Sequence, residues 1–362
     1  MNRQSALDGF RGLLLVVMTI DHLPGLFRLY SYEALGFASA AEGFVFLSGF
    51  VAAMVYGREA DPLRCRTTVL ARVRKIYKYH LVLLFGILAL ALLIPEYSEG
   101  WTRWLQPFDS RPEESLLLAF GLLYQPQYLD ILPMYCVFLA LLPWALRLMR
   151  AGRGASVLVA SFLFWLLGQG ITDTERGLTD FFEFPFALSF FNLLAWQFLF
   201  MLGAYFGNRY REGWKPAYSL SSVTAAVSVG VFLFAVRHGL WGFERLPVGA
   251  ATERSTMAWL RLVDVLVLAY LLTGLARLLP WLFRVPALEA LGRNSLQVYS
   301  YHVLLVYLLS PLVREAVGEY GWEADLPLTL AALLSLGLPV VTYGWYKEAH
   351  GQIRSAWRRL TV

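Results

Sequence analysis

The chain has 362 residues, of which 58% are hydrophobic and only 16% are charged, and its formal net charge at pH 7 is +5. A soluble globular protein cannot bury that much apolar surface, so the composition excludes this class and favours an all-α, polytopic integral membrane protein. The positive charge is explained by Lys and Arg gathered on one side of a bilayer, and it gives no reason to expect a nucleic-acid partner.

About ten apolar segments follow one another along the chain, each near the ~20 residues that a helix needs to cross a bilayer core. In chain order they cover residues 10–29, 37–56, 79–95, 128–146, 155–170, 188–207, 219–237, 258–277, 294–312 and 327–346. Ser5 and Asp8 are typical of a helix cap that leads directly into the first segment, which argues against a cleaved signal peptide. No linker interrupts the series, so residues 1–362 are predicted to form a single transmembrane domain.

The distribution of Lys and Arg predicts the orientation of these helices. The segment 57–78, which we expect to be a loop, carries Arg58, Arg64, Arg66, Arg72, Arg74, Lys75 and Lys78. Basic residues are enriched on the cytoplasmic side of a membrane. Both termini are therefore predicted to be cytoplasmic, in agreement with an even number of crossings.

The first apolar segment carries two ionisable residues on one helical face. Arg11 and His22 are eleven residues apart, which on an α-helix is three turns plus about 20°, or about 16 Å along the axis. Asp21 points about 100° away from His22. A donor with an anionic head that entered from the cytoplasm would meet Arg11 first and bring its reactive end to His22. The simpler explanations are an interfacial arginine and a histidine that packs against a neighbouring helix.

Glu42 in the second segment and Asp264 in the eighth are expected at a depth close to that of His22. A charged side chain in mid-bilayer costs about 2.5–3.5 kcal/mol on insertion scales, so each needs a partner or a role. Either carboxylate could orient the His22 imidazole or keep it basic. The alternative for Asp264 is an ion pair with Arg261, one turn away. Small residues around Ser48 favour close helix packing in the second segment.

The ninth segment places Ser295, Tyr299 and His302 four and three residues apart, so the three side chains share one helical face and could line a common cavity. His302 invites a metal site, but the chain has only 5 histidines and 2 cysteines, without the spacing of a ligand set. No metal is therefore predicted. The sequence also lacks a phosphate-binding glycine loop, a dinucleotide motif and a serine in a nucleophile elbow.

The basic segment ends in ARVRKIYKYH, with Arg72, Arg74 and Lys75 directly before the third apolar segment. Arginine binds phosphate oxygens through paired hydrogen bonds, so this cluster could hold the phosphates of a donor. Its simpler explanation is the positive charge that keeps a loop in the cytoplasm. The external loops 96–127 and 170–187 mix acids with aromatic residues, which suits either an interfacial aromatic belt or a surface that binds sugars.

Four stretches resemble motifs of the transmembrane acyltransferase (acyltransferase-3-like) superfamily. They are Arg11-x10-His22, GFVFLSGF (43–50), ARVRKIYKY without the usual proline, and LGRNSLQVYSYH (291–302). Within this superfamily, ALDGFRGLLLVVMTIDHL followed by AEGFVFLSGFV is most similar to the OpgC family, which succinylates osmoregulated periplasmic glucans. The resemblance implies a transmembrane O-acyltransferase of the bacterial inner membrane that moves a succinyl group from cytoplasmic succinyl-CoA to hydroxyls of a periplasmic glucan.

The resemblance implies His22 as the base and donor contacts at Arg11 and at the Arg72–Lys75 cluster. The full predicted site has the catalytic residues His22, Glu42 and Asp264 and the donor-binding residues Arg11, Ser48, Arg72, Arg74, Lys75, Ser295, Tyr299 and His302. No cofactor is expected to be permanently bound, because acyl-CoA is the donor substrate. The expected partners are this donor, a glucan or oligosaccharide acceptor, the lipid bilayer and, as an open alternative, a second copy of the chain in a homodimer.

Other functions stay open at this stage. The transferred group could be acetyl, on another surface polysaccharide, whereas a succinyl group would want a cation for its carboxylate, for which Arg261 is a candidate. Transfer could be direct or pass through an acyl-histidine. A proton-coupled transporter would use Asp21, Glu42 and Asp264 as a proton relay. A membrane scaffold without activity would gain nothing from so many ionisable residues within the bilayer.

Overall fold

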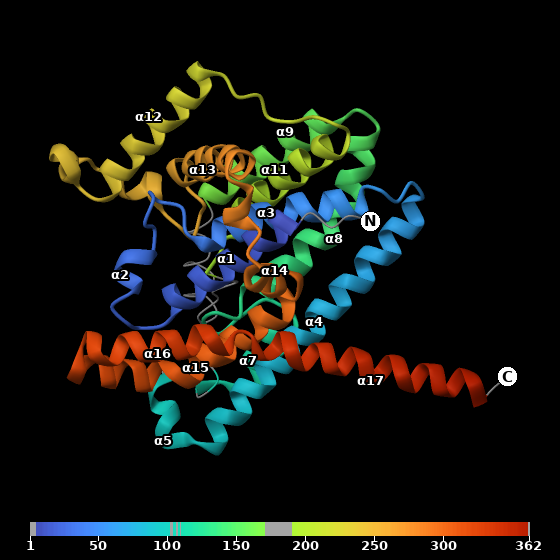
Figure 1. Ribbon diagram of the computed structural model, residues 1–362, viewed down its shortest axis with the longest axis vertical. Coiled ribbons are helices and arrows are strands. Elements are labelled where there is room, and N and C mark those ends of the chain that lie inside the picture. Colours follow the sequence, from blue (N-terminus) through green and yellow to red (C-terminus); the bar gives the residue numbers. More distant parts are fainter. Residues whose placement is uncertain (1–4, 102–103, 106–107, 109, 171–189, 361–362) are drawn as a thin grey trace. The chain divides into compact units, whose positions relative to one another are not determined.

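The computed structural model describes residues 5–101, 104–105, 108, 110–170 and 190–360, and all regular secondary structure in these ranges is helical (Figure 1). The all-α prediction is therefore confirmed for this part of the chain. The predicted external loop 170–187 lies, except for its first residue, outside the described residues. The chain forms two compact units, and the larger, Glu33–Leu275, is inserted in the sequence of the smaller, which comprises Met1–Tyr32 and Ala276–Val362. The single domain over 1–362 stays a prediction beside this division.

The smaller unit is built from both ends of the sequence. Its helices are α1 (Ser5–His22), α2 (Arg28–Ser31), η4 (Pro280–Phe283), α14 (Pro286–Arg293), α15 (Ser295–Tyr320), α16 (Trp322–Ser335) and α17 (Leu338–Leu360). α1 touches α14 backbone to backbone: a Cβ at Gly12 would lie 2.0 Å from the carbonyl oxygen of Leu288, and one at Gly292 would lie 1.8 Å from that of Asp8. Only glycine lets two helices approach so closely, and this contact sets the rotation of α1.

The turn that follows α1 is held by a buried carboxylate of α16. Oδ2 of Asp325 accepts hydrogen bonds from the backbone N–H groups of Leu26 at 2.6 Å and Phe27 at 3.0 Å. Its Oδ1 accepts a third from the hydroxyl of Thr329 at 3.1 Å, and the side chain is fully buried. Polar backbone groups away from water need such partners. Asp325 thus fixes the end of the helix that carries His22.

The larger unit contains the remaining helices of the described residues. They are α3 (Ala40–Tyr56), α4 (Pro62–Leu93), α5 (Pro95–Ser98), η1 (Glu99–Trp101), α7 (Pro112–Phe120), α8 (Ile131–Arg150), α9 (Gly154–Gly170), α11 (Leu193–Arg211), α12 (Leu220–Arg237), η2 (Leu240–Arg245), η3 (Gly249–Thr252) and α13 (Trp259–Leu278). The last of them, α13, continues past the boundary of the unit at Leu275. α3 lies directly on α11, because a Cβ at Gly49 would lie 2.0 Å from the carbonyl oxygen of Phe200, and one at Gly203 2.1 Å from that of Phe46. The close packing predicted for the small residues of the second apolar segment is confirmed.

The loop predicted for residues 57–78 is wrong, because most of this segment is helical. After Gly57, α4 begins at Pro62 and continues without a break to Leu93, so most of the basic segment is helical. The Asp61 side chain accepts from the N–H of Leu63, and Pro62 occupies the first helical turn, which is a standard way to start a helix. Arg, Lys and Leu are good helix formers, so the helix passes from its charged half into its apolar half.

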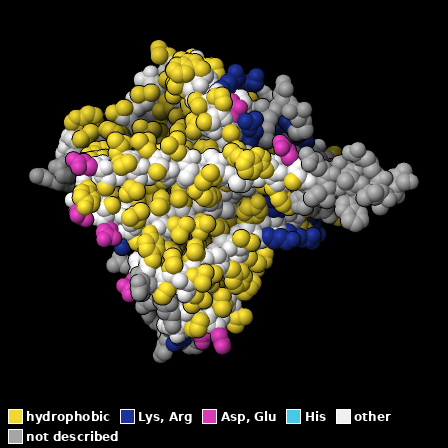
Figure 2. Space-filling model, turned by 60° about the horizontal axis from the view of Figure 1, so that its bottom comes forward, with side chains coloured by type: hydrophobic (Ala, Val, Ile, Leu, Met, Phe, Trp, Pro, Cys, Tyr) yellow, Lys and Arg dark blue, Asp and Glu magenta, His cyan; other side chains and the backbone are white. Residues whose placement is uncertain are grey.

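Six helical stretches of the described residues are long and apolar enough to cross a membrane. They are Pro62–Leu93, Ile131–Arg150, Leu220–Arg237, Trp259–Leu278, Ser295–Tyr320 and Trp322–Ala349. Large apolar side chains are exposed on them, among them Leu92 at 84% and Leu334 at 81%, and Figure 2 shows hydrophobic side chains over much of the visible surface. Such surfaces suit contact with lipid. The chain is therefore a multi-pass membrane protein in composition and helix length, while ten crossings and cytoplasmic termini stay predictions.

Candidate active site

Two side chains of α1 contact two side chains of α15 within the smaller unit. Nη2 of Arg11 donates a hydrogen bond to Oγ of Ser295 at 2.7 Å, and Nδ1 of His22 lies 3.1 Å from Nε2 of His302. Arg11 and His22 are eleven positions apart on α1. Their partners Ser295 and His302 are only seven positions apart on α15, which is about two helical turns. The long Arg11 side chain can make up the difference. The faces predicted for these two helices therefore meet, although the chemical roles of the residues stay predictions.

His302 is fully buried and has a second fixed contact. Its Nδ1 lies 2.7 Å from the backbone carbonyl oxygen of Tyr299, and its ring stacks near that of His22, with 5.3 Å between the ring centres. A carbonyl oxygen can only accept, so Nδ1 of His302 carries a proton and donates it. The Tyr299 ring, itself 1% exposed, meets the His302 ring edge-on at 4.9 Å. Helix α15 thus holds His302 in one orientation toward His22.

The Asp21 carboxylate, next to His22 on α1, has a local partner. Oδ1 of Asp21 accepts a hydrogen bond from the hydroxyl of Ser31 at 2.6 Å, and Asp21 is buried. This bond connects the last turn of α1 with α2. Leu15 and Met18, also buried, lie between Arg11 and His22 along the helix. Arg11 and His22 therefore lie at the two ends of a stripe of α1 whose apolar residues are packed inside the protein.

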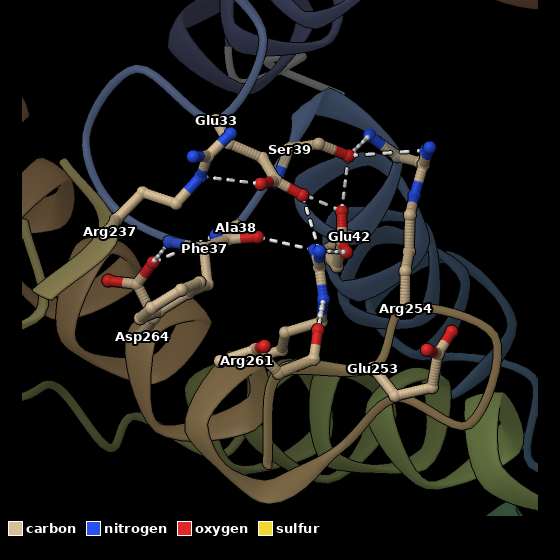
Figure 3. A network of polar contacts seen from close by, with 12 residues as sticks. Glu33, Phe37, Ala38, Ser39, Glu42, Arg237, Glu253, Arg254, Arg261 and Asp264 are labelled. Carbon is tan, nitrogen blue, oxygen red and sulfur yellow. Dashed lines mark hydrogen bonds and ion pairs between the residues drawn. The ribbon is translucent and has the colours of Figure 1, made fainter. Parts of the chain in front are cut away.

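Glu42, predicted to act beside His22, belongs to a buried charge network in the larger unit (Figure 3). Its Oε1 accepts from Nη1 of Arg261 at 2.9 Å, and its Oε2 accepts from the backbone N–H of Ser39 at 3.0 Å. Nη2 of Arg261 forms a second ion pair, with Glu33, and Nε of Arg237 pairs with the same carboxylate at 2.7 Å. The Arg261 and Glu33 side chains are each only 6% exposed. Both carboxylates are therefore compensated by arginine.

Asp264 holds the chain segment that leads into α3. Its Oδ2 accepts hydrogen bonds from the backbone N–H groups of Phe37 at 2.7 Å and Ala38 at 2.8 Å (Figure 3). Gly36 has φ +154°, and a Cβ there would lie 2.4 Å from Oδ2 of Asp264. Arg261 donates to the carbonyl oxygen of Phe37 in the same segment and to that of Thr252 at the end of η3. The role of Asp264 as an orienting acid for His22 stays a prediction; its contacts here stabilise a loop.

Glu253, outside the predicted spans, borders this network on the loop before α13. The backbone N–H of Ser255 donates to its carboxylate at 3.0 Å, and the hydroxyl of the same residue donates at 2.9 Å. These hydrogen bonds, the backbone bond first among them, lower the pKa of Glu253 below its usual value. Glu253 therefore adds a further anion beside the arginines of Figure 3 at neutral pH.

The basic residues of α4 do not all point the same way. Residues two apart on a helix diverge by about 200°, whereas residues three apart lie on neighbouring faces. Arg72 and Lys75 are half-buried, and Arg74 is exposed. The helix therefore places Arg74 on a different face from the other two residues, which the sequence analysis grouped as one cluster. On α3, Ser48 is buried, and its hydroxyl has no hydrogen-bond partner within the described residues.

A comparison with protein families assigns the chain. A family model described as OpgC protein matches residues 3–348, nearly the whole sequence. The chain belongs to the OpgC family. No curated protein and no solved structure matches it. OpgC membership bears out the resemblance seen in the motifs, and it implies an acyltransferase role connected with the succinylation of osmoregulated periplasmic glucans.

Several residues that hold buried contacts in this OpgC protein were not among the predicted site residues. Glu33 and Arg237 join the Arg261 network although 204 positions separate them, and Asp325 anchors the turn after α1 from 299 positions away. A contact between residues far apart in the sequence produces no local spacing pattern from which it could be predicted. A partial signal existed at Asp325, which is an acid within an apolar run and therefore needs a partner.

Proposed function

We propose that this protein is a transmembrane O-acyltransferase that moves a succinyl group from cytoplasmic succinyl-CoA to hydroxyl groups of a periplasmic glucan. The main support is the pairing of Arg11 and His22 of α1 with one face of α15. It provides an arginine for an anionic part of the donor and an imidazole for proton transfer on one stripe of the same helix. Membership of the OpgC family supports the same assignment independently of this geometry.

In the proposed reaction, His22 takes the proton of an acceptor hydroxyl while the hydroxyl oxygen attacks the carbonyl carbon of the thioester. A C–O ester bond forms and the C–S bond breaks. The proton then passes from the imidazolium to the thiolate of coenzyme A, which leaves as the thiol. His22 returns to its starting form, and no further reactant is needed. In the alternative with an acyl-histidine, His22 would attack the thioester first.

Donor recognition is proposed for Arg11 and for Arg72 with Lys75. Arg11 keeps one hydrogen bond to Ser295, which orients its guanidinium, and the half-buried pair on α4 offers charge for phosphates. The buried hydroxyl of Ser48 is a group that a bound ligand could satisfy. Arg261 is a poor candidate for the succinyl carboxylate, because Glu33 and Glu42 already neutralise its charge.

The first prediction is that cells with the protein carry succinyl esters on their periplasmic glucans and that His22→Ala removes them. Loss of a general base lowers turnover by about 10²- to 10⁴-fold, while donor binding should persist. Mass spectrometry of the glucans, and turnover and donor affinity of the purified protein, measure both. His238→Ala is the matched control, because His238 is exposed at the end of α12 and should leave turnover unchanged.

The possible results separate the functions that the sequence left open. An added acetyl mass would replace the succinyl donor but keep the enzyme class. Glucan movement across the membrane without any added mass would overturn the acyltransferase and favour a transporter. Turnover of His22→Ala close to that of the natural protein would overturn His22 as the base.

A further inference from the structure

The contact between His22 and His302 is the last link in a chain of three polar groups. The backbone carbonyl of Tyr299 lies 2.7 Å from Nδ1 of His302, and Nε2 of His302 lies 3.1 Å from Nδ1 of His22. All three groups belong to α1 and α15 of the smaller unit. His302 has 0% exposure, and its ring contacts both the Tyr299 ring and the His22 ring. No water needs to be invoked to connect these groups.

The carbonyl at one end fixes the protons along this chain. Because the Tyr299 oxygen only accepts, the proton of His302 sits on Nδ1. A fully buried His302 is neutral, since a charged ring there would lose its hydration, and in the described part of the chain its ring nitrogens contact the Tyr299 carbonyl and the His22 ring but no carboxylate. Nε2 of His302 is therefore an acceptor, and Nδ1 of His22 must donate to it. A neutral His22 with its proton on Nδ1 carries its basic lone pair on Nε2.

We propose that His302 is a positioning residue for His22, which selects the Nδ1–H tautomer and directs the Nε2 lone pair toward the proton of the acceptor hydroxyl. This inference rests on the proposed function, in which His22 is the base. It replaces the donor-binding role that the sequence suggested for His302. It also assigns the orienting role to an imidazole, in place of the carboxylate expected from Glu42 or Asp264.

A neutral partner suits a base within a bilayer. When His22 accepts a proton on Nε2, its Nδ1–H keeps the hydrogen bond to Nε2 of His302, and that bond becomes charge-assisted as positive charge develops. No proton has to leave His302 in this step. A carboxylate partner would stabilise the imidazolium more strongly, but it would bury a negative charge in the resting protein. A base oriented by a third group in this way follows the general logic of catalytic triads.

The test compares two amide substitutions of equal polarity. In His302→Gln, the amide lies near the position of Nε2, where its oxygen can accept from Nδ1 of His22. In His302→Asn, the amide is one carbon shorter and reaches only the position of Nδ1, next to the Tyr299 carbonyl. Both variants are measured in the full-length protein, with turnover and donor affinity determined separately. Ser310→Ala is the control, because Ser310 is buried on the same helix and bonds only within its own turn, to the Val306 carbonyl.

The expected result is a split between turnover and binding. His302→Asn should lower kcat by about 100-fold, the scale of a mispositioned general base, with donor affinity within about threefold of the natural protein. His302→Gln should recover at least a tenth of natural turnover, and Ser310→Ala should retain full turnover. Thermal unfolding of all three variants checks that each is folded.

Three outcomes would overturn the inference. Equal turnover of the Asn and Gln variants would show that the contact to His22 is immaterial, and loss of donor affinity with unchanged kcat would return His302 to the donor site. A natural protein that needs His22 for transfer but tolerates His302→Asn would refute the positioning role alone. Absence of transfer by the natural protein would instead refute the proposed function, so the two failures are distinct.

Discussion

Arg261 lies at the centre of the buried charge network of the larger unit, in which Arg237 also pairs with Glu33. It joins the carboxylates of Glu33 and Glu42 and also donates to backbone carbonyls of Phe37 and Thr252. Glu42 is fully buried, so an unpaired charge there would be costly. Because both acids are compensated, the network supports a structural role for Glu42 better than a proton relay.

Replacement of Arg261 by Met should therefore destabilise the protein strongly. Removal of one partner from a buried pair costs about 3–5 kcal/mol, because the other charge is left without compensation. The matched variant is Arg237→Met. The Arg237 side chain is 33% exposed and, within the described ranges, bonds to Glu33 alone, so we expect a cost of about 1 kcal/mol or less. Thermal unfolding in detergent measures both. Similar midpoints for the two variants would contradict the central place given to Arg261.

Residue spacing within one helix was enough to predict part of the candidate site. Eleven positions between Arg11 and His22, and seven between Ser295 and His302, defined faces that do meet. The partner of His22 was beyond reach, because 280 positions separate it from His302 and the sequence offers Glu42 and Asp264 as equal candidates. Periodicity reports which way a side chain points but not which distant helix it meets.

At the scale of elements, α4 changes how its basic cluster can work. The helix runs unbroken from Pro62 to Leu93, so the positions of its arginines are fixed around one axis. The charge of residues 57–78 favoured a loop, whereas Asp61 and Pro62 carry the signal for a helix start. A membrane helix can therefore begin well before its apolar residues, where a cap and a proline form its first turn.

The α4 helix predicts unequal effects of its basic residues on the donor. Arg72→Ala should raise the apparent donor KM by about tenfold, the loss of one charge-assisted contact of about 1.5 kcal/mol, with kcat unchanged. Arg74→Ala, on the exposed face, is the matched control and should change KM less than twofold. Initial rates over a range of donor concentrations measure both. An equal effect of the two substitutions would mean that the cluster acts only through its total charge.

At the scale of the whole chain, the number and direction of crossings remain the main prediction to test. With Cys65 and Cys136 replaced by alanine, Asn2→Cys and Thr361→Cys would each provide one thiol near a terminus. Both should resist a membrane-impermeant maleimide in intact spheroplasts and react after permeabilisation. Labelling of only one terminus in intact spheroplasts would contradict an even number of crossings, and labelling of both would reverse the orientation.

Composition and hydropathy predicted the fold class because a bilayer permits few solutions for a chain of this kind. Each of the ten apolar segments overlaps a helix in the described residues, yet only six stretches are long and apolar enough to span. α1 is not among the six, because its 18 residues include Asp8, Arg11 and Asp21. Arg11, one of the polar residues that lower the hydropathy of α1, is also a residue of the candidate site.

The partners of α1 also have a consequence for synthesis. Ser295, His302 and Asp325 are translated about 280 to 300 positions after the residues they contact. At 5–20 residues per second, the helix with His22 waits about 15–60 s on the ribosome before its partners exist. A nascent chain that stops before α15 has the proposed base but nothing to orient it. Only a protein translated almost to its end can assemble the site, so a prematurely terminated chain would not consume the acyl donor.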